Sequence, residues 1–184
     1  MSVRGETPAA GPLEMHISLV GMMGAGKSSV GRLLAQQLGR RFVDTDARIV
    51  AQNGITIAAL FEERGEAAFR TIESDVIEEC LADVAPAVLS LGGGAVLGER
   101  NRIALRSGSI VAWLRATPET LLQRVGTGAV RPLLAGDPEA AIRRIDAERR
   151  PLYALCAHVV VDVDELRLSQ VADCVRMSVE HIAR

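Results

Sequence analysis

Short apolar stretches alternate with longer segments of helical periodicity along most of the chain. The short stretches predict strands at 16–20, 41–43, 87–91, 109–114 and 158–161. The longer segments predict helices at 27–38, 45–82, 99–106, 118–125, 138–155 and 165–183. Since alternating short apolar strands and helices are typical of βαβ units, the pattern predicts an α/β fold whose parallel sheet is covered by helices on both faces.

Three segments fit this alternation poorly. Residues 45–74 carry enough helical sequence for two helices between neighbouring strands, and we interpret them as a substrate-binding insertion. Residues 124–137 contain several glycines and a proline among basic residues, which predicts a lid. Residues 1–14 are rich in glycine, proline and small residues, which predicts a disordered tail before one domain at 15–184.

Composition narrows the class of protein further. The chain has 184 residues, of which 48% are apolar and 24% charged, and its formal charge is −2. This balance predicts a globular protein that binds neither nucleic acid nor membranes. No stretch is long enough to span a bilayer, the N-terminus has no apolar signal segment, and the three cysteines show no CxxC spacing. We therefore expect a cytoplasmic protein, without disulfides or a zinc site, that acts as a monomer.

A phosphate-binding loop is the most specific motif in the chain. Residues 21–28, GMMGAGKS, match GxxxxGK[ST] between a predicted strand and a predicted helix. In such a loop the glycines let backbone N–H groups face phosphate oxygens. Lys27, the only lysine, is then expected to pair with the β- and γ-phosphates of ATP, and Ser28 to bind Mg²⁺. The predicted ATP contacts in the loop are Gly24, Ala25, Gly26, Lys27, Ser28 and Ser29.

Two carboxylates follow the second predicted strand. Side chains alternate along a strand, so Asp44 and Asp46 are expected to point the same way, near the phosphate loop at the carboxyl edge of the sheet. One would serve the metal and the other the acceptor. The pair could also cap a helix that starts at about residue 47, and this role is compatible with the chemical one.

Four further blocks complete a family pattern: FEERGEAAFR at 61–70, LGGGA at 91–95, RPLL at 131–134 and RRPLY at 149–153. With the phosphate loop and the DTD sequence at 44–46, these blocks resemble shikimate kinase over about 17–161. The resemblance implies a P-loop NTPase-type three-layer sandwich with a five-stranded parallel sheet, like that of nucleoside-monophosphate kinases. It also implies Mg²⁺-dependent transfer of the γ-phosphoryl group of ATP to the 3-hydroxyl of shikimate. The products would be ADP and shikimate 3-phosphate, in a step of chorismate and aromatic amino acid biosynthesis.

The resemblance also implies roles for individual residues. Asp46 would hold ring hydroxyls of shikimate, Arg70 and Arg149 would clamp its carboxylate, and Glu73 would orient Arg70. A small acid with three hydroxyls suits these groups, because guanidinium binds carboxylate in a two-point geometry. Backbone of Gly92, Gly93 and Gly94 and an apolar wall of Phe61, Phe69, Pro132 and Leu133 would complete the acceptor site.

The same resemblance places residues on the nucleotide side. Asp44 would hold magnesium through water, Arg124 would lie against adenine, and Arg131 would reach the transferring phosphate when the lid closes. The expected catalytic residues are Lys27, Asp46 and Arg131. The chain departs from the family after the last strand, where VDELR at 163–167 stands in place of a further basic residue or proline against adenine.

Two other functions are compatible with parts of this pattern. A related P-loop kinase for another small acceptor, such as gluconate, would share the phosphate loop but would not need the two arginines Arg70 and Arg149 together with the DTD sequence. A catalytically inactive binding protein could share the whole scaffold. The intact set of Lys27, Ser28 and Arg131 argues against this second alternative.

Overall fold

The computed structural model describes residues 14–125 and 137–182. The predicted tail therefore lies outside the described residues except for Glu14. So do most of the predicted lid and three predicted site residues, Arg131, Pro132 and Leu133.

The described chain alternates between strands and helices. The strands are β1 (His16–Val20), β2 (Arg41–Asp44), β3 (Ala87–Ser90), β4 (Ser109–Arg115) and β5 (Val159–Asp162). The α-helices are α1 (Lys27–Leu38), α2 (Thr45–Asn53), α3 (Ile57–Leu81), α4 (Glu99–Gly108), α5 (Pro118–Val125), α6 (Pro138–Cys156) and α7 (Leu168–Ile182). A short 3₁₀ helix, η2 (Ala95–Leu97), follows β3.

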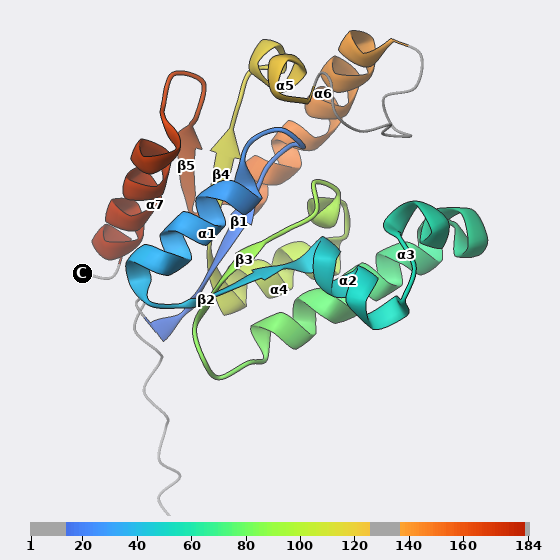
Figure 1. Cartoon of the computed structure of the whole chain (residues 1–184), viewed down its shortest axis with the longest axis horizontal. Helices are drawn as coiled ribbons and strands as arrows, with labels where there is room; N and C mark the ends of the chain where they lie inside the picture. The colour runs from blue at the N-terminus through green and yellow to red at the C-terminus, as the bar shows by residue number, and fades with distance from the viewer. Residues whose placement is uncertain (1–13, 126–136, 183–184) are drawn as a thin grey trace, which may run out of the picture.

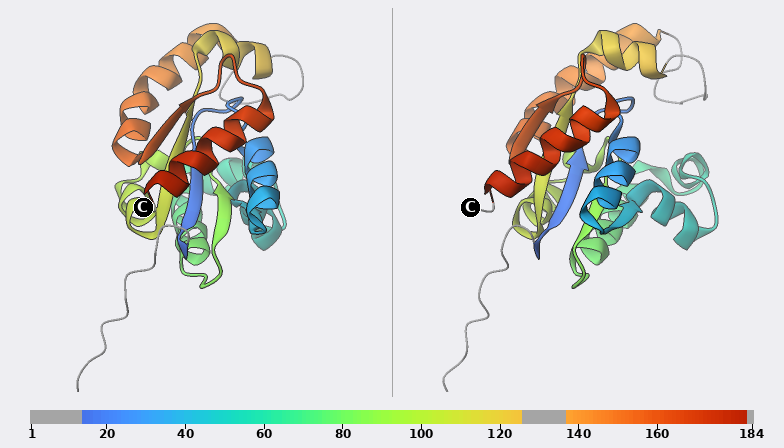
Figure 2. Two further views of the ribbon diagram at one scale, coloured as in Figure 1. Left: turned by 90° about the vertical axis from the view of Figure 1, so that its left-hand side faces the viewer. Right: turned by 60° about the vertical axis from the view of Figure 1, so that its left-hand side comes forward.

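The five strands form one sheet in the order β2-β3-β1-β4-β5, and every pair is parallel. Helices α1 and α7 pack against each other on one face, while α3, α4 and α6 cover the other (Figures 1 and 2). This arrangement confirms the predicted three-layer α/β fold. Because parallel strands all end at the same edge, the segments that follow β1, β2 and β3 meet there.

The core explains why the central strands are so apolar. Every residue of β1 and β3 is buried, since helices cover both faces of the sheet at these strands. The exceptions to the apolar pattern in these two strands are His16, Ser18 and Ser90, which are exposed by only 5%, 0% and 2%. In the described part of the chain, no helix combines the length and the apolar character that crossing a membrane requires.

One predicted helix boundary was wrong, and one predicted helical segment forms the two helices that its length indicated. The helical segment 45–82 is divided, because Gly54 ends α2 in the left-handed conformation and Thr56 caps α3 by accepting from the amide of Ala59. The last helix begins three residues later than predicted, at Leu168. There Asp164 accepts hydrogen bonds from the amide and hydroxyl of Thr117, and these bonds hold the chain after β5 in a non-helical conformation.

Candidate active site

The phosphate loop connects β1 to α1 and has the backbone that its glycines permit. Gly24 has φ of 83° and Gly26 has φ of 91°, a region that residues with a side chain rarely adopt. Gly26 is also the residue before α1, so the loop leads directly into a helix N-terminus, where unpaired N–H groups and the helix dipole favour anions. The loop therefore has the geometry of a phosphate site.

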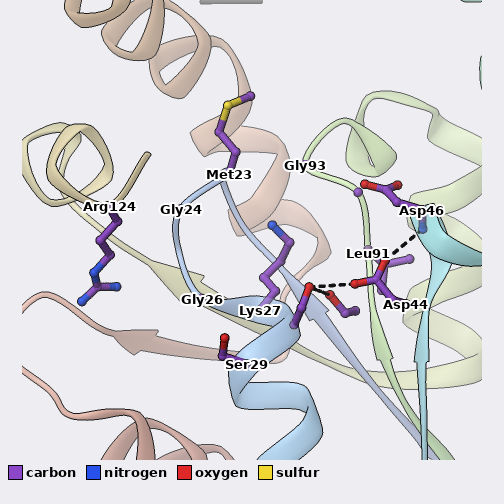
Figure 3. Close-up of a pocket in the computed structure, with 13 residues that line it drawn as sticks. Met23, Gly24, Gly26, Lys27, Ser29, Asp44, Asp46, Leu91, Gly93 and Arg124 are labelled. Carbon is purple, nitrogen blue, oxygen red and sulfur yellow. Dashed lines mark hydrogen bonds between the residues drawn. The ribbon is translucent and has the colours of Figure 1, made fainter. Parts of the chain in front are cut away.

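The Lys27 side chain folds back across the phosphate loop and binds its backbone. Its ammonium group donates to the carbonyl oxygens of Gly21 at 2.8 Å and Met22 at 3.0 Å. Figure 3 shows the side chain rising within the loop, with Asp44 and Asp46 on one side and Arg124 on the other. A cation at this place can contact the terminal phosphates of a bound nucleotide.

Side-chain oxygen atoms of three residues lie close together where the phosphate loop enters α1. The Ser28 hydroxyl donates to Asp44 Oδ2 at 2.7 Å and lies 3.2 Å from the Ser90 hydroxyl (Figure 3). The other carboxylate oxygen, Asp44 Oδ1, accepts from the amides of Asp46 and Ala47 and so caps α2. Asp44 therefore caps a helix, one of the two roles considered from the sequence, and it also contacts Ser28, the residue expected to bind Mg²⁺ with it.

This oxygen cluster suits a hard cation such as Mg²⁺, which prefers carboxylate, hydroxyl and phosphate oxygens. Within residues 14–125 and 137–182, no group of three or more His, Cys, Asp or Glu side chains could hold a metal ion. The protein thus offers only part of a coordination shell at Ser28 and Asp44. Such a partial shell is typical of sites where Mg²⁺ arrives with the phosphates of a nucleotide.

These groups line a cavity of about 440 Å³ at the carboxyl edge of the sheet (Figure 3). Most of the predicted nucleotide residues and part of the acceptor set contribute to its wall. They are Gly24, Gly26, Lys27, Ser28, Ser29, Asp44, Asp46, Gly92, Gly93 and Arg124. Ala25 is buried within the loop and is not part of this wall.

The glycine run after β3 brings the remaining acceptor residues to the same place. A Cβ atom on Gly92 would lie 2.6 Å from Asp46 Oδ1, and one on Gly94 would lie 2.5 Å from Arg70 Nη1. A Cβ atom on Gly93 would lie 3.5 Å from Arg149 Nη1. Each glycine therefore faces one of the three charged groups predicted to bind the acceptor, and at Gly92 and Gly94 a side chain would collide with them.

Arg70 is held by carboxylates and aromatic rings of α3. Its guanidinium donates to Glu73 at 2.7 Å and to Glu66 at 3.1 Å, and it lies over the rings of Phe61 and Phe69. Burial raises the pKa of Glu73, and the charge and hydrogen bond of Arg70 act in the opposite direction. The expected orienting contact of Glu73 with Arg70 is present.

The aromatic pair beside Arg70 depends on a break in α3. Gly65 has φ of 76° and ψ of 169°, so the helix is interrupted between Phe61 and Phe69. The interruption brings the two rings together, with centroids 4.4 Å apart. Two of the four residues predicted for the apolar wall, Phe61 and Phe69, are thus neighbours of Arg70, and the other two lie outside the described residues.

Neighbouring arginines on α6 have different surroundings. Arg149 is only 7% exposed, and it forms no ion pair within the described part of the chain. Arg150 pairs with Asp146 at 2.8 Å and lies over the ring of Trp113, so its charge is used within the fold. A buried guanidinium without a carboxylate partner is costly, and an anionic ligand would compensate Arg149.

Arg124 extends from α5 on the other side of the phosphate loop. Its guanidinium donates to the carbonyl oxygen of Val163 at 2.9 Å. The divergent segment 163–167 therefore contributes a backbone atom that orients Arg124, a role that its side chains did not suggest.

The predicted placement of Asp46 at the end of strand β2 was wrong. Strand β2 ends at Asp44, and Asp46 belongs to the first turn of α2 rather than to the strand. Alternation along a strand thus does not bring the two carboxylates together. They share the cavity because Asp44 caps the helix that carries Asp46.

Sequence reasoning also missed two hydroxyl residues that join the ends of β2 and β3. Thr45 is fully buried, donates to the carbonyl oxygen of Ser90 at 3.2 Å and accepts from the amide of Gly92 at 3.4 Å. Ser90 in turn reaches Ser28. The only available signal was their position next to the DTD and GGG blocks.

Comparison with known proteins decides the family. A model of the family described as "Shikimate kinase" matches residues 23–180. The chain belongs to the shikimate kinase family. The shikimate kinase of Symbiobacterium thermophilum is 49% identical over 160 residues, which cover 85% of this chain and 91% of that protein. The shikimate kinase of Bordetella pertussis is 43% identical and is covered to 79%, with 90% of this chain matched.

Solved structures agree with this assignment. Shikimate kinase from Acinetobacter baumannii in complex with shikimate aligns with a TM-score of 0.86 and 38% identity, over 91% of this chain and 93% of that chain. A gluconokinase from Sinorhizobium meliloti aligns with a TM-score of 0.57 at 17% identity, a similarity that concerns the fold alone. The expected class of ATP-dependent kinase with an alcohol acceptor is confirmed by the family.

Proposed function

We propose that this chain transfers the γ-phosphoryl group of ATP to the 3-hydroxyl of shikimate. The observation that carries the proposal is the glycine run at 92–94, where Asp46, Arg70 and Arg149 converge beside the phosphate loop. Membership in the shikimate kinase family supports the same reaction.

Nucleotide binding would use the phosphate loop and the residues around it. The N–H groups of the loop and Lys27 would hold the phosphates, while Ser28 and Asp44 would hold Mg²⁺, Asp44 through water. Mg²⁺, when bound, would neutralise charge on the β- and γ-phosphates. Arg124, held by the carbonyl of Val163, would lie against adenine.

Acceptor binding would use the glycine run at the edge of the cavity and the charged groups that face it. Arg70 and Arg149 would grip the carboxylate of shikimate, and Asp46 would accept hydrogen bonds from its ring hydroxyls. The buried position of Arg149 without an ion-pair partner among the described residues supports this role, since a bound carboxylate would compensate its charge. Phe61 and Phe69, with Pro132 and Leu133 from the predicted lid, would exclude water from the ring.

The chemistry would then depend on position and charge. The 3-hydroxyl oxygen forms a bond to the γ-phosphorus as the bond from that phosphorus to the β,γ-bridging oxygen breaks, and the bridging oxygen leaves with ADP. The hydroxyl proton passes late to the Asp46 carboxylate. Lys27 and Arg131 would stabilise charge on the transferring group, because phosphoryl transfer has a loose transition state that needs little help from a base.

Gluconate remains the alternative acceptor to exclude. The gluconokinase similarity carries no information about substrate at its level of identity, and the combination of Arg70 and Arg149 with the DTD sequence at 44–46 favours shikimate. Cytoplasmic location and a monomeric state remain predictions from the sequence.

A coupled ADP-release assay across shikimate, quinate, gluconate and AMP tests the proposal. We expect kcat/KM for shikimate to exceed that of quinate, and to exceed that of gluconate and AMP by at least about a hundredfold, because neither of these two offers both a carboxylate for the arginines and a ring hydroxyl for Asp46 in the same arrangement. A higher value for gluconate or AMP would contradict it.

A further inference from the structure

All three carbonyl oxygens of the glycine run are engaged inside the protein. Those of Gly92 and Gly94 accept from the amides of Ala95 and Leu97, each at 3.0 Å, in the turns that lead into η2. The carbonyl oxygen of Gly93 accepts instead from the hydroxyl of Tyr153, at 2.6 Å and from 60 residues away. The contact of the Gly93 carbonyl is therefore the only one of these three that does not come from the local turns.

Tyr153 is firmly placed for this contact. Its side chain is fully buried, and its ring stacks on Trp113 with centroids 5.7 Å apart. It lies one helical turn after Arg149 on α6, so one helix presents both the arginine and the hydroxyl to the glycine run. Burial raises the pKa of the Tyr153 phenol far above its ordinary value, which keeps the hydroxyl protonated as a donor.

The peptide between Gly93 and Gly94 needs such an anchor. Glycine permits far more backbone conformations than other residues, so a peptide flanked by two glycines can rotate at little cost. In a trans peptide the C=O and the following N–H point in opposite directions. Fixing the oxygen of Gly93 toward Tyr153 therefore aims the N–H of Gly94 the other way.

That N–H group is available. The amide of Gly94 makes no hydrogen bond to any part of the chain that the structure describes, while its neighbour Gly92 donates to Thr45. The adjacent Gly93 lines the cavity, and the Arg70 guanidinium lies against Gly94. A rotated peptide would instead present a carbonyl oxygen near these groups, where it would repel an anionic acceptor and compete for the arginine.

We infer that Tyr153 is a positioning residue that locks the Gly93–Gly94 peptide so that the glycine run offers a donor, not an acceptor, to the substrate. This inference rests on the proposed function, because it concerns the binding of the acid acceptor. Tyr153 would exert this role through the backbone of the glycine run, and its hydroxyl also lies beside Arg149, whose charge opposes the rise in the phenol pKa.

Tyr153→Phe tests the inference, since it keeps the ring and its stacking on Trp113 and removes only the hydroxyl. We expect KM for shikimate to rise about tenfold, the loss of roughly one hydrogen bond, while the Kd for ADP stays within twofold of wild type. Ser109→Ala is the matched control. It removes a buried hydroxyl that donates to the Leu105 carbonyl at 2.7 Å, far from the cavity, and should leave both constants unchanged.

Three outcomes would overturn the inference. One is a shikimate KM within twofold of wild type in Tyr153→Phe. Another is an equal weakening of shikimate and ADP in a Tyr153→Phe protein that unfolds at the wild-type temperature, which would show that the hydroxyl does not act on the acceptor site in particular. A wild-type protein that does not phosphorylate shikimate would remove the proposed function and this inference with it.

A second measurement on the unsubstituted sequence covers the case in which Tyr153→Phe does not fold. The chain has a single tyrosine, so protein labelled with 3-fluorotyrosine gives one ¹⁹F resonance. We expect that resonance to shift when shikimate saturates the site. An unchanged resonance with shikimate bound would contradict the inference.

Discussion

Gly94→Ala tests the link between the glycine run and Arg70 without changing a charged residue. Gly94 has φ of −91° and ψ of −5°, the conformation of the third residue of a type I turn, which most residues including alanine adopt. The new methyl group would lie 2.5 Å from Arg70 Nη1 and 2.7 Å from Nη2. The guanidinium and the turn must therefore separate.

The size of that separation follows from the contacts. Ordinary Cβ contacts begin at 3.4 Å, so the two groups must move apart by about 0.9 Å. Misplacing a binding group by about 1 Å can reduce catalysis by about a hundredfold. We expect kcat/KM for shikimate to fall by about 30- to 100-fold. The stability of the fold should change by less than about 1 kcal/mol, because the end of a flexible side chain can give way and alanine restricts the unfolded chain.

The assay is steady-state kinetics with shikimate, beside calorimetric ADP binding and thermal unfolding on the same preparation. Gly98→Ala is the matched control, because its new methyl would lie 3.4 Å from the nearest atom of Asn101, an ordinary contact. The control should behave like wild type in all three measurements. Unchanged shikimate kinetics in Gly94→Ala would refute the placement of Arg70 in the acceptor site, and a matching loss of ADP affinity would show that the damage is not confined to that site.

Three further predictions use single substitutions. Arg149→Lys should lower kcat/KM for shikimate at least about thirtyfold, because an ammonium group cannot bind a carboxylate at two points as guanidinium does. Its control, Arg150→Lys, should keep kcat/KM within about threefold of wild type. Equal effects of the two substitutions in parallel kinetics would contradict the distinction between these arginines. Arg131→Ala should lower kcat about a hundredfold with ADP affinity unchanged in calorimetry; a parallel loss of ADP affinity would make Arg131 a ground-state contact. Burial lowers the pKa of His158 in the folded protein below that of the unfolded chain. As the pH falls below about 6.5, the unfolded chain therefore binds a proton at this histidine more readily than the folded protein does, and the free energy of unfolding decreases. Denaturant titrations at pH 7.5 and 5.5 should show a larger loss in wild type than in His158→Asn, which keeps an acceptor for the Val111 amide, and equal losses would contradict this cause.

The sequence predicted the architecture because its strongest signals are local. Apolar strands followed by amphipathic helices give a parallel sheet, and the GxxxxGKS motif predicts a phosphate loop between β1 and α1. The late start of α7 escaped prediction for a different reason. The start of α7 depends on a contact between Asp164 and Thr117, two residues far apart in sequence.

In the candidate site, too, residues with local sequence signals could be predicted, whereas residues whose roles depend on distant contacts could not. Residues inside recognisable blocks, such as Arg70 and Arg149, could be named from the sequence through their resemblance to a family. Thr45 and Tyr153 could not, because their roles depend on which strand ends and which helix lie beside the glycine run. Arg149 and Arg150 also differ in burial and in ion pairing, and this difference follows from the packing of α6, which the sequence does not show.

A crystal structure of this protein with shikimate, ADP and Mg²⁺ tests the central claim most directly. The account predicts the shikimate carboxylate within hydrogen-bonding distance of both Arg70 and Arg149, and a ring hydroxyl on Asp46. The 3-hydroxyl should face the phosphate loop. A carboxylate bound away from both arginines, or a 3-hydroxyl directed away from the nucleotide, would contradict it.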